Sequence, residues 1–504
     1  MPPLDVLIEA PDPTSAVPLH SQLYLRVREA IGSGRILPGS RLPASRQLCT
    51  ELGLSRNTVL TAVQQLTAEG YLESRLGSGT FVASHLPDQV LPPLPPLTPG
   101  ARPRSSSPRT ALSKRGELLT TTSLGMALPV RPRPFQPGIP ALAELPHETW
   151  ARIGARLRRR PPADLLSYGD SRGYWPLREA VAERLRRTRA VRAVGDQVLI
   201  VQGAQQALYL TALLLLDPGD SAWVEDPCYP GLRAALLAAG ISVVPVPVDP
   251  DGLDVAQARR LCEGARLAGV TPSHQSPLGV EMTLRRRLEL LDWARQCGAW
   301  VLEDDYDSEY RFAGPQLAAL QGLDQHERVI FAGTFSKSLF PSLRLGYLVV
   351  PPELVSAFAA AIAATSRQSP TLEQAQLAEF IAGGHLDSHV RRMRVLYEHR
   401  QQVLVAEVAR QLGELLDVPP AAAGMDVIGW LPEGTDERSV TRVAARRGVS
   451  VVSISTTYAS RQSPRPGLIL GYAGYSDGSI RQGVTRLRST LHEVLAGSSR
   501  IDGP

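Results

Sequence analysis

The segment GTFSKSLFPSLRLGY, residues 333–347, carries the residues that most directly indicate the fold and chemistry of this chain. The apolar run RVIFA leads into it and predicts a β-strand that ends in small polar residues. These include Lys337, and Arg344 follows seven positions later. A lysine amine held in a confined site forms a Schiff base with an aldehyde. Thr334, Ser336 and Arg344 can supply the hydroxyls and the guanidinium that a phosphate group needs. The alternative is a strand followed by a solvated basic loop.

The low number of lysines in the chain supports Lys337 as a candidate for Schiff-base chemistry. The chain has only two lysines, Lys114 and Lys337, so 52 of its 54 basic residues are arginine. Arginine stays protonated at working pH, whereas a lysine amine can become neutral and nucleophilic. Codon usage is the ordinary explanation of such a bias. A lysine inside a folded domain of this chain is nevertheless a candidate for chemistry that arginine cannot perform.

Two further segments predict the rest of a cofactor pocket. VLEDDYDSEYRF (301–312) places Asp304 at the carboxyl end of an apolar strand, where α/β proteins bind ligands. A buried aspartate keeps a pyridinium nitrogen protonated, and Tyr306 can hydrogen-bond a ring hydroxyl. A solvated loop or a magnesium site are the alternatives. GAQQALYL (203–210) follows the strand QVLIV and offers the free amides of a helix N-terminus to an anion.

Apolar runs and helical patterns alternate around these segments over roughly 200 residues. The runs are QVLIV, AWVEDP, ISVVPVPV, ARLAGVTP, AWVLEDD, RVIFAGT and GYLVV. This alternation predicts an α/β fold with a mainly parallel sheet. The chain is more helical from about residue 370 and ends in a small α+β unit. Residues 86–130 are dense in proline and serine and predict an extended linker.

Residues 18–84 predict a separate unit. Leu19, Leu23, Val27 and Ile31 recur at helical spacing, and a short helix, a turn at Gly53 and a second helix follow. Two β-prone runs around a Gly-Ser-Gly sequence then predict a hairpin. This order is typical of a winged helix-turn-helix, whose second helix enters the major groove of DNA. Small three-helix cores without DNA function share the same spacing.

The residues expected to contact DNA fall into three groups. The recognition helix begins with short polar and guanidinium groups suited to bases and phosphates. Residues just before and on the preceding helix offer phosphate contacts, and the hairpin tip is glycine-rich. The candidates are Ser55, Arg56, Asn57 and Thr58 for the first group, Arg41, Ser45 and Arg46 for the second, and Gly77 and Gly79 for the third.

The bulk composition is consistent with two or three soluble units. The 504 residues are 43% hydrophobic, and the net charge of +5 permits nucleic-acid binding without requiring it. The four cysteines are scattered, so we expect neither a disulfide framework nor a metal site, and a reducing cytoplasm fits. The acidic N-terminal segment lacks the features of a signal peptide, and no apolar run reaches the length of a membrane span.

The motifs resemble known families. LPASRQLCTELGLSRNTVLTAVQQLTAEGYLESRLGSGTFVA resembles the winged-helix domain of GntR-family bacterial regulators. From about residue 131 to the end, the chain resembles fold-type I aminotransferases. The strings TPSHQSPLG, EDDYDSEYRF and GTFSKSLFPSLRLGYLVVP resemble the MocR/GabR group of regulators, in which both domains are fused. The resemblance implies a DNA-binding domain over 1–85, the linker over 86–130 and an aminotransferase-like domain over 131–504.

The resemblance also implies pyridoxal phosphate as the cofactor and assigns residues to it. Lys337 would form the Schiff base, Asp304 would contact the pyridine nitrogen and Tyr306 the ring hydroxyl. Ala204, Gln205, Thr334 and Arg344 would surround the phosphate. Tyr229 would lie beside the ring, and Tyr168 would reach into the site of a neighbouring subunit, which implies a homodimer. Ser276 replaces the asparagine of the aminotransferase N-P-x-G motif.

One departure bears on function. Ile469 occupies the position of the arginine that grips the amino-acid carboxylate in many aminotransferases, and Arg233, Arg367 and Arg465 are the nearest spare guanidiniums by sequence. Loss of a bidentate clamp is not easily offset. We therefore expect a cytoplasmic, dimeric transcription regulator that binds operator DNA. Its effector is either an amino-acid-like molecule or pyridoxal phosphate itself. The competing hypothesis is an active aminotransferase with an appended DNA-binding head.

Overall fold

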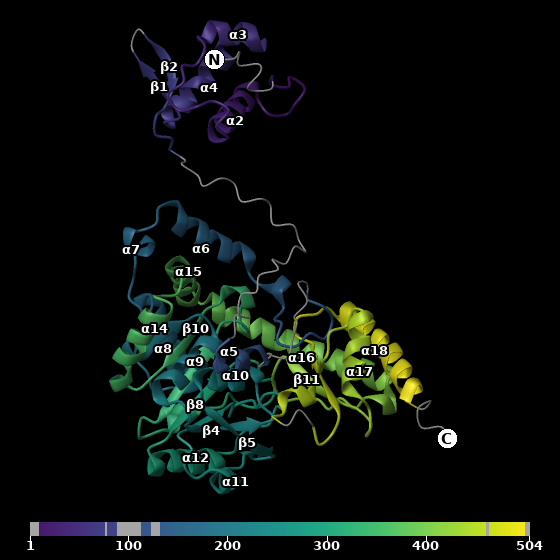
Figure 1. The fold of residues 1–504 in the computed structure, drawn as a ribbon. Helices are drawn as coiled ribbons and strands as arrows, with labels where there is room; N and C mark the ends of the chain where they lie inside the picture. Colours follow the sequence, from purple (N-terminus) through teal and green to yellow (C-terminus); the bar gives the residue numbers. More distant parts are fainter. Residues whose placement is uncertain (1–9, 76–77, 88–111, 122–131, 460–462, 499–504) are drawn as a thin grey trace. The chain divides into compact units, whose positions relative to one another are not determined.

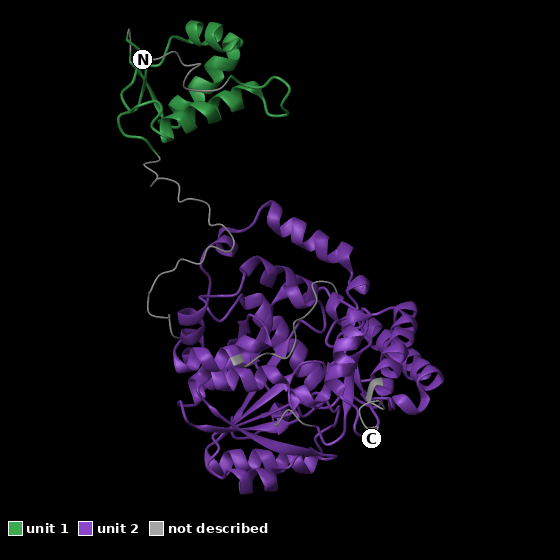
Figure 2. Ribbon diagram, turned by 45° about the vertical axis from the view of Figure 1, so that its right-hand side comes forward, with its two compact units in different colours: residues 1–110 green, residues 111–504 purple. Residues whose placement is uncertain are grey.

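The computed structural model describes residues 10–75, 78–87, 112–121, 132–459 and 463–498 (Figure 1). The chain divides into two compact units, residues 1–110 and residues 111–504 (Figure 2). Each unit has its own hydrophobic core, and we describe each by itself.

The N-terminal unit contains three helices and a β-hairpin. They are α2 (Leu19–Gly32), α3 (Ser45–Leu52), α4 (Arg56–Ala68), β1 (Leu72–Arg75) and β2 (Gly79–Val82). Gly53 ends α3 in the left-handed conformation, with φ of 64°. Ser55 caps α4 by accepting a hydrogen bond from the Thr58 amide at 3.2 Å. The helices and the hairpin predicted for this unit are therefore confirmed.

Burial in this unit largely follows the helical periodicity, although Leu19, at the start of α2, is only half-buried. Leu23, Val27 and Ile31 of α2 pack into the same core as Val59 and Leu66 of α4. Val63 of α4 is only partly buried, and Ala62 is the buried residue at that turn of the helix. β1 and β2 pair antiparallel, from Leu72 opposite Val82 to Arg75 opposite Gly79.

The C-terminal unit is built on an eight-stranded, mainly parallel sheet. The strand order is β3-β10-β9-β8-β7-β4-β5-β6. The strands are β3 (Val198–Val201), β4 (Ser221–Asp226), β5 (Ser242–Asp249), β6 (Gly252–Leu253), β7 (Leu267–Val270), β8 (Trp300–Asp305), β9 (Val329–Thr334) and β10 (Gly346–Val349). All seven apolar runs expected to be strands are strands. β10 lies antiparallel to both of its neighbours, so β3 runs in the same direction as β9.

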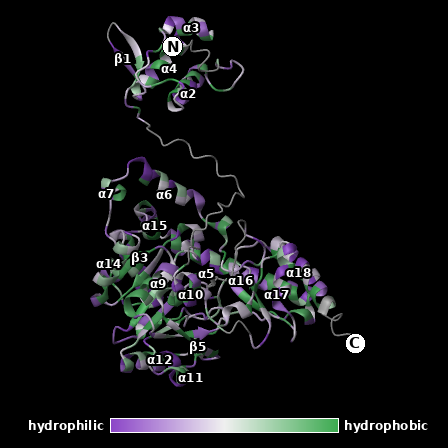
Figure 3. Ribbon diagram, in the orientation of Figure 1, coloured by the Kyte–Doolittle hydropathy of each residue, from purple (hydrophilic) through white to green (hydrophobic). Residues whose placement is uncertain are grey.

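Helices cover both faces of this sheet. One face packs against α9 (Ala204–Leu215), α10 (Pro230–Ala239) and α14 (Val355–Thr365). Hydrophobic residues gather on the sheet and on α9 and α14 (Figure 3). The other face packs against five helices: α8 (Trp175–Arg189), α11 (Val255–Leu261), α12 (Leu284–Cys297), α15 (Thr371–Ala382) and α16 (His385–Gln411).

A smaller α+β subdomain forms the C-terminal part of this unit, as predicted from the sequence. It contains β11 (Asp426–Trp430), β12 (Val452–Ser453), β13 (Gly467–Gly471), α17 (Glu437–Arg446) and α18 (Asp477–Ser498). β13 lies between β11 and β12 and is antiparallel to both. Ile428 of β11 lies directly opposite Ile469 of β13. The helices α6 (His147–Arg159), α7 (Ala163–Leu166) and α13 (Leu320–Leu323) also belong to the C-terminal unit.

One helix lies inside the range expected to be an extended linker. α5 (Lys114–Thr121) has the sequence KRGELLTT, and the Ser113 hydroxyl accepts from the Gly116 amide at 3.0 Å at its start. Local helix formers and an N-terminal serine outweigh the proline-rich average of the range. Among the helices of the described residues, none is long and apolar enough to cross a lipid bilayer.

Candidate cofactor site

The sheet brings three distant segments to one edge. β8 and β9 are parallel neighbours, with Asp304 opposite Ala332, and the Lys337 loop follows β9. β3 runs in the same direction as β9 and is followed by α9. Carboxyl ends of strands that share a direction lie at one edge, where α/β sheets bind their ligands. The candidate site is therefore this edge.

Lys337 is held by a segment from the start of the unit. Its Nζ donates a hydrogen bond of 3.0 Å to the carbonyl oxygen of Gly138. The Gly138 amide in turn donates to Oδ1 of Asp426, at 2.9 Å. Burial raises the pKa of the Asp426 carboxyl to about 6, against the favourable effects of the Gly138 amide and the Lys337 amine.

Asp304 is buried at the end of β8. Its side chain is 5% exposed, and its Oδ1 has no hydrogen-bond partner among the described residues. Burial, with Asp305 and Glu225 adding negative charge, raises the pKa of the Asp304 carboxyl to about 7, while Lys337 lowers it. A buried acceptor without a partner is costly, so this oxygen fits a cationic N–H donor from a bound group.

Tyr306 lies in a polar cluster beside Asp304. Its Oη is 3.0 Å from Nδ1 of His274, and the two rings stack with centroids 5.9 Å apart. Nδ1 of His274 also lies 2.9 Å from Oδ1 of Asp307. Burial lowers the pKa of His274, but the Asp307 carboxylate outweighs it and the net pKa is raised. Ser276 hydrogen-bonds Tyr306, whose pKa burial raises well above its usual value.

The opposite end of the site has the character of an anion site. Thr334 Oγ1 accepts from the Ser336 amide, and its hydroxyl donates to Ser336 Oγ, both at 3.1 Å. Arg344 is exposed and donates to the Gln202 carbonyl oxygen at 3.0 Å. A Cβ added at Gly203 would lie 3.4 Å from the Arg344 guanidinium. The guanidinium therefore lies against the start of α9, where a phosphate would also find free amides.

Gln205 and Tyr229 lie beside this anion site. Gln205, in the first turn of α9, donates to the Gly231 carbonyl oxygen at 2.9 Å, and its own Oε1 is buried without a partner among the described residues. Burial raises the pKa of Tyr229, with Asp304 adding to the rise and Arg344 opposing it. Tyr229 is therefore within electrostatic reach of both ends of the site.

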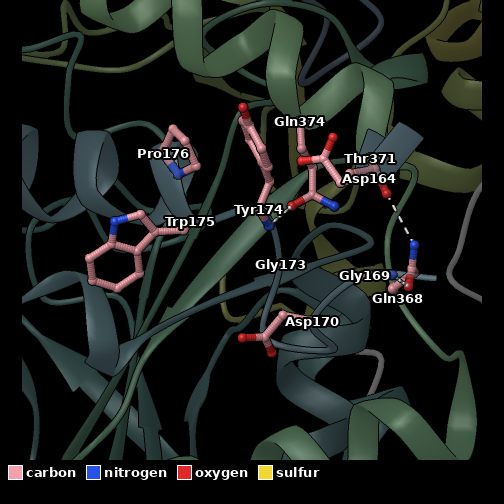
Figure 4. Close-up of a pocket in the computed structure, with 10 residues that line it drawn as sticks. All are labelled: Asp164, Gly169, Asp170, Gly173, Tyr174, Trp175, Pro176, Gln368, Thr371 and Gln374. Carbon is pink, nitrogen blue, oxygen red and sulfur yellow. Dashed lines mark hydrogen bonds between the residues drawn. The ribbon is translucent and has the colours of Figure 1, made fainter. Parts of the chain in front are cut away.

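Tyr168 is not brought to this group. It is 82% exposed, and Arg367 lies over its ring at 5.3 Å. A cavity of about 440 Å³ lies next to it, between the chain that leads into α8 and the start of α15 (Figure 4). There Gln374 accepts from the Tyr174 amide at 2.7 Å, and Gln368 accepts from the Gly169 amide at 2.6 Å. The residues that line this cavity do not include Lys337.

The three spare arginines are engaged elsewhere. Arg233 donates to the carbonyl oxygens of Thr456 and Thr457. Arg367 stacks on Tyr168, and Arg465 pairs with Asp417 at 3.5 Å and lies over the Trp430 ring. Ile469 is 8% exposed in the middle of β13. Within the described part of the chain, the interactions of these arginines therefore do not involve Lys337.

The DNA-binding candidates present an accessible surface in the N-terminal unit. Arg41, Arg46, Ser55, Arg56, Asn57 and Gly79 are exposed, and Ser45 and Thr58 are half-buried. Arg56 and Asn57 open α4, and a Cβ added at Gly79 would lie 3.0 Å from the Arg41 guanidinium, so Arg41 lies against the hairpin. Gly77 lies outside the described residues.

Comparison with known proteins identifies both units. Residues 146–487 match aminotransferase class I and II, and residues 19–82 match the bacterial regulatory proteins of the gntR family. The chain is 41% identical to the probable rhizopine catabolism regulatory protein MocR of Rhizobium meliloti, over 95% of each chain. It is 34% identical to the HTH-type transcriptional regulator TauR of Rhodobacter capsulatus, over 94% of this chain and 96% of TauR. The chain belongs to the MocR group of GntR-family transcription regulators.

Solved structures similar to this MocR-group chain include aminotransferases. LysN, the α-aminoadipate aminotransferase of Thermus thermophilus, superimposes with a TM-score of 0.66 and 28% identity, over 76% of this chain and 96% of LysN. LysN was crystallised with N-(5'-phosphopyridoxyl)-L-leucine. The fold of the C-terminal unit is that of the pyridoxal phosphate-dependent aminotransferases, and pyridoxal phosphate is its cofactor. The unpartnered buried oxygen of Asp304 and the anion site near Arg344 fit this group.

Sequence reasoning missed several residues of this MocR-group site. Gly138, Asp307 and Asp426 contact the Lys337 and Tyr306 region, yet none was a candidate. His274 was noted only as part of a motif. A signal existed for Asp307, which lies in the same acidic segment as Asp304. Gly138 and Asp426 come from distant segments without a recognisable pattern.

Proposed function

We propose that this protein regulates transcription by binding operator DNA through its winged helix, and that occupancy of the Lys337 site alters that binding. In this proposal the effector is pyridoxal phosphate itself or an amino-acid-like molecule that meets the cofactor there. Coupling requires that the effector favour one arrangement of the protein by a few kcal/mol. Because operator DNA is the target, the proposed location is the cytoplasm.

The geometry of the site supports the roles proposed for its residues. When bound, pyridoxal phosphate supplies an aldehyde that reacts reversibly with primary amines. Lys337 holds the cofactor covalently, and its amine is oriented by the Gly138 carbonyl oxygen. Asp304 keeps the ring nitrogen protonated, and Tyr306, with Ser276 beside it, binds the ring hydroxyl. The remaining proposed contacts are Tyr229 beside the ring and Ala204, Gln205, Thr334, Ser336 and Arg344 around the phosphate.

A homodimer is part of the proposal. Tyr168 is among the most exposed large residues of the described chain, and it belongs to the C-terminal unit that carries the cofactor site. An exposed aromatic ring with a hydroxyl is suited to an interface where one end is apolar and the other polar. We infer that Tyr168 completes the phosphate site of a second copy of this chain. Two winged helices in one dimer would then read two operator half-sites.

Ile469 is the observation that favours regulation over catalysis. An amino-acid substrate needs a partner for its carboxylate, and the aliphatic side chain at this position supplies none. The cofactor constellation of Lys337 and Asp304 would equally serve an aminotransferase with an appended DNA-binding head. Sustained turnover of an amino acid with a keto acid would favour that second function.

The deciding experiment is a footprint on the DNA upstream of the protein's own gene, with and without pyridoxal phosphate. We expect a protected region whose extent or affinity changes with the cofactor. Lys337→Ala should keep a footprint that no longer responds to the cofactor, and it should lose the visible absorbance of the bound cofactor. Arg56→Ala should weaken the footprint and keep the absorbance. An unchanged spectrum in Lys337→Ala would contradict the site assignment.

A further inference from the structure

A second cavity has a wall residue, Asp426, that is connected to Lys337 through the hydrogen bonds of Gly138. It has a volume of about 250 Å³, and Asp426, His274, Ile428 and Trp430 contribute to its lining. Asp426 is linked to Lys337 through Gly138, which donates its amide to the carboxylate and accepts the lysine amine at its carbonyl. A molecule that reached the cofactor from this side would therefore lie next to Asp426.

Asp426 and His274 are the ionisable residues of this lining, and Asp426 is the one that forms no ion pair with the described residues. His274 also lines the cavity, but it pairs with Asp307 at 2.9 Å, and both side chains are buried. This ion pair leaves little net charge facing the cavity. The neighbouring Arg311 is likewise neutralised by an ion pair with Glu281. No lysine or arginine belongs to the cavity lining among the described residues.

One oxygen of Asp426 remains for a ligand. Oδ1 accepts from the Gly138 amide, whereas Oδ2 accepts no hydrogen bond from the described residues. The side chain is half-buried and is part of the cavity wall. Its pKa of about 6, raised by burial, leaves it ionised at pH 7.5.

The cavity wall beside this carboxylate is apolar, since Ile428 lies two residues from Asp426 on the same face of β11. Ile428 lines the cavity and lies directly opposite Ile469 on the neighbouring strand, so the two side chains share one face of the small sheet. Ile469 is the position of the missing carboxylate-binding arginine. A carboxylate entering this cavity would meet Asp426 and aliphatic carbon, and both disfavour it.

We propose that this cavity selects a small primary amine that carries a second cationic group, and that Asp426 is the residue that recognises that group. The proposal rests on the proposed function and narrows its effector from amino-acid-like molecules to diamine-like ones without a carboxylate. The cavity is smaller than the roughly 300–1,000 Å³ typical of pockets for drug-sized ligands, so it suits a short aliphatic chain.

Three probes of equal length test the charge preference. They are 1,4-diaminobutane, butylamine and 4-aminobutanoate, which place a cation, a methyl group or a carboxylate at the far end of one chain. Each is titrated calorimetrically into the cofactor-loaded protein at pH 7.5. A charge-assisted hydrogen bond should give the diamine roughly tenfold or greater affinity over butylamine. The carboxylate probe should bind more weakly than butylamine.

Two variants test whether the preference for a cationic group arises in this cavity. Asp426→Asn keeps the size and the acceptor for the Gly138 amide, and it should reduce the affinity ratio of diamine to butylamine to about one. Ile469→Arg introduces the missing cation and should raise the affinity for 4-aminobutanoate above that for the diamine. The operator footprint and the visible cofactor absorbance of each variant verify that it is folded and loaded.

The outcomes separate this proposal from the proposed function. Tightest binding of 4-aminobutanoate to the unaltered protein, an unchanged ratio in Asp426→Asn, or no binding of any probe by protein that holds cofactor and binds its operator would each overturn the diamine preference. The regulator assignment would survive all three results. Absence of cofactor absorbance or of a footprint in the unaltered protein would instead contradict the proposed function.

Discussion

Lys337 donates its Nζ hydrogen bond to the carbonyl oxygen of Gly138, a residue 199 positions earlier in the chain. Gly138 has a positive φ of 72°, and a Cβ at this position would lie within van der Waals overlap of the lysine nitrogen. The amide of Gly138 also donates a hydrogen bond to Asp426 of β11. A single glycine therefore links the lysine, the start of the C-terminal unit and the small sheet.

The first prediction concerns this glycine. Gly138→Ala should displace the lysine amine and lower the affinity for pyridoxal phosphate roughly tenfold or more, as followed by titration of the visible absorbance. Gly384→Ala is the matched control, because Gly384 has a similar φ of 71° and open space at its Cβ position. It carries the same backbone strain without the contact. Equal affinities of the two variants would contradict the positioning role of Gly138.

The second prediction concerns the pH dependence of stability through Asp304. The carboxyl has an ordinary pKa of 3.8 and a folded pKa of about 7, raised mainly by burial. Folding of the cofactor-free protein therefore takes up a proton between these values, so its stability falls as the pH rises from about 4 to about 7. Asp304→Asn removes this titration. It should stabilise the cofactor-free protein at pH 8 relative to the unaltered protein and have little effect at pH 4, as measured by denaturant unfolding.

In the presence of cofactor, the same substitution should be unfavourable instead of favourable. Asparagine cannot balance a protonated ring nitrogen, so Asp304→Asn should lower the cofactor affinity at pH 8. A cofactor affinity equal to that of the unaltered protein would show that Asp304 does not face the ring.

The third prediction concerns the DNA contact of Arg56. This exposed residue begins α4, and its loss should weaken operator binding by roughly tenfold or more. If it binds a phosphate, the slope of log affinity against log salt should also fall by about one. Arg35→Ala is the control, since Arg35 is an exposed arginine in the same unit that pairs with Glu29. Gel-shift titrations at several salt concentrations measure both quantities.

The fourth prediction concerns Tyr168. If its hydroxyl reaches the phosphate site of a second copy, Tyr168→Phe should lower the cofactor affinity several-fold while the protein stays dimeric in light scattering. Dimers mixed from Tyr168→Phe and Lys337→Ala subunits should regain one site of normal affinity. That site combines an intact lysine from one subunit with an intact tyrosine from the other. A site confined to one subunit would give no such recovery.

The fold could be predicted from the sequence because its signals are local. Gly53 and Ser55 mark the turn between two helices by their backbone and capping preferences, and the structure places both as expected. The strand runs of the large sheet are apolar without alternation, as expected of strands covered on both faces. α5 was missed because the average composition of residues 86–130 hid a short helical sequence.

The sequence indicates candidate site residues only where a motif carries them. Lys337, Asp304 and Tyr306 stand at the ends of apolar strands, so their types and positions were informative. Gly138 and Asp426 act through a hydrogen bond that joins residues 288 positions apart. No local periodicity encodes such a pairing, since it depends on how the small sheet packs against the start of the unit.

Because lysine is scarce in this protein, the reactivity of its lysine amines can report how much of the protein holds the cofactor. Besides the α-amino group, its only two ε-amines are Lys114, exposed at the start of α5, and Lys337, held beside Gly138. An amine-selective reagent should modify Lys114 whatever the state of the site, whereas covalently bound cofactor would shield Lys337. The ratio of the two modified peptides in a mass spectrum would then report the fraction of loaded molecules directly, even inside a living cell.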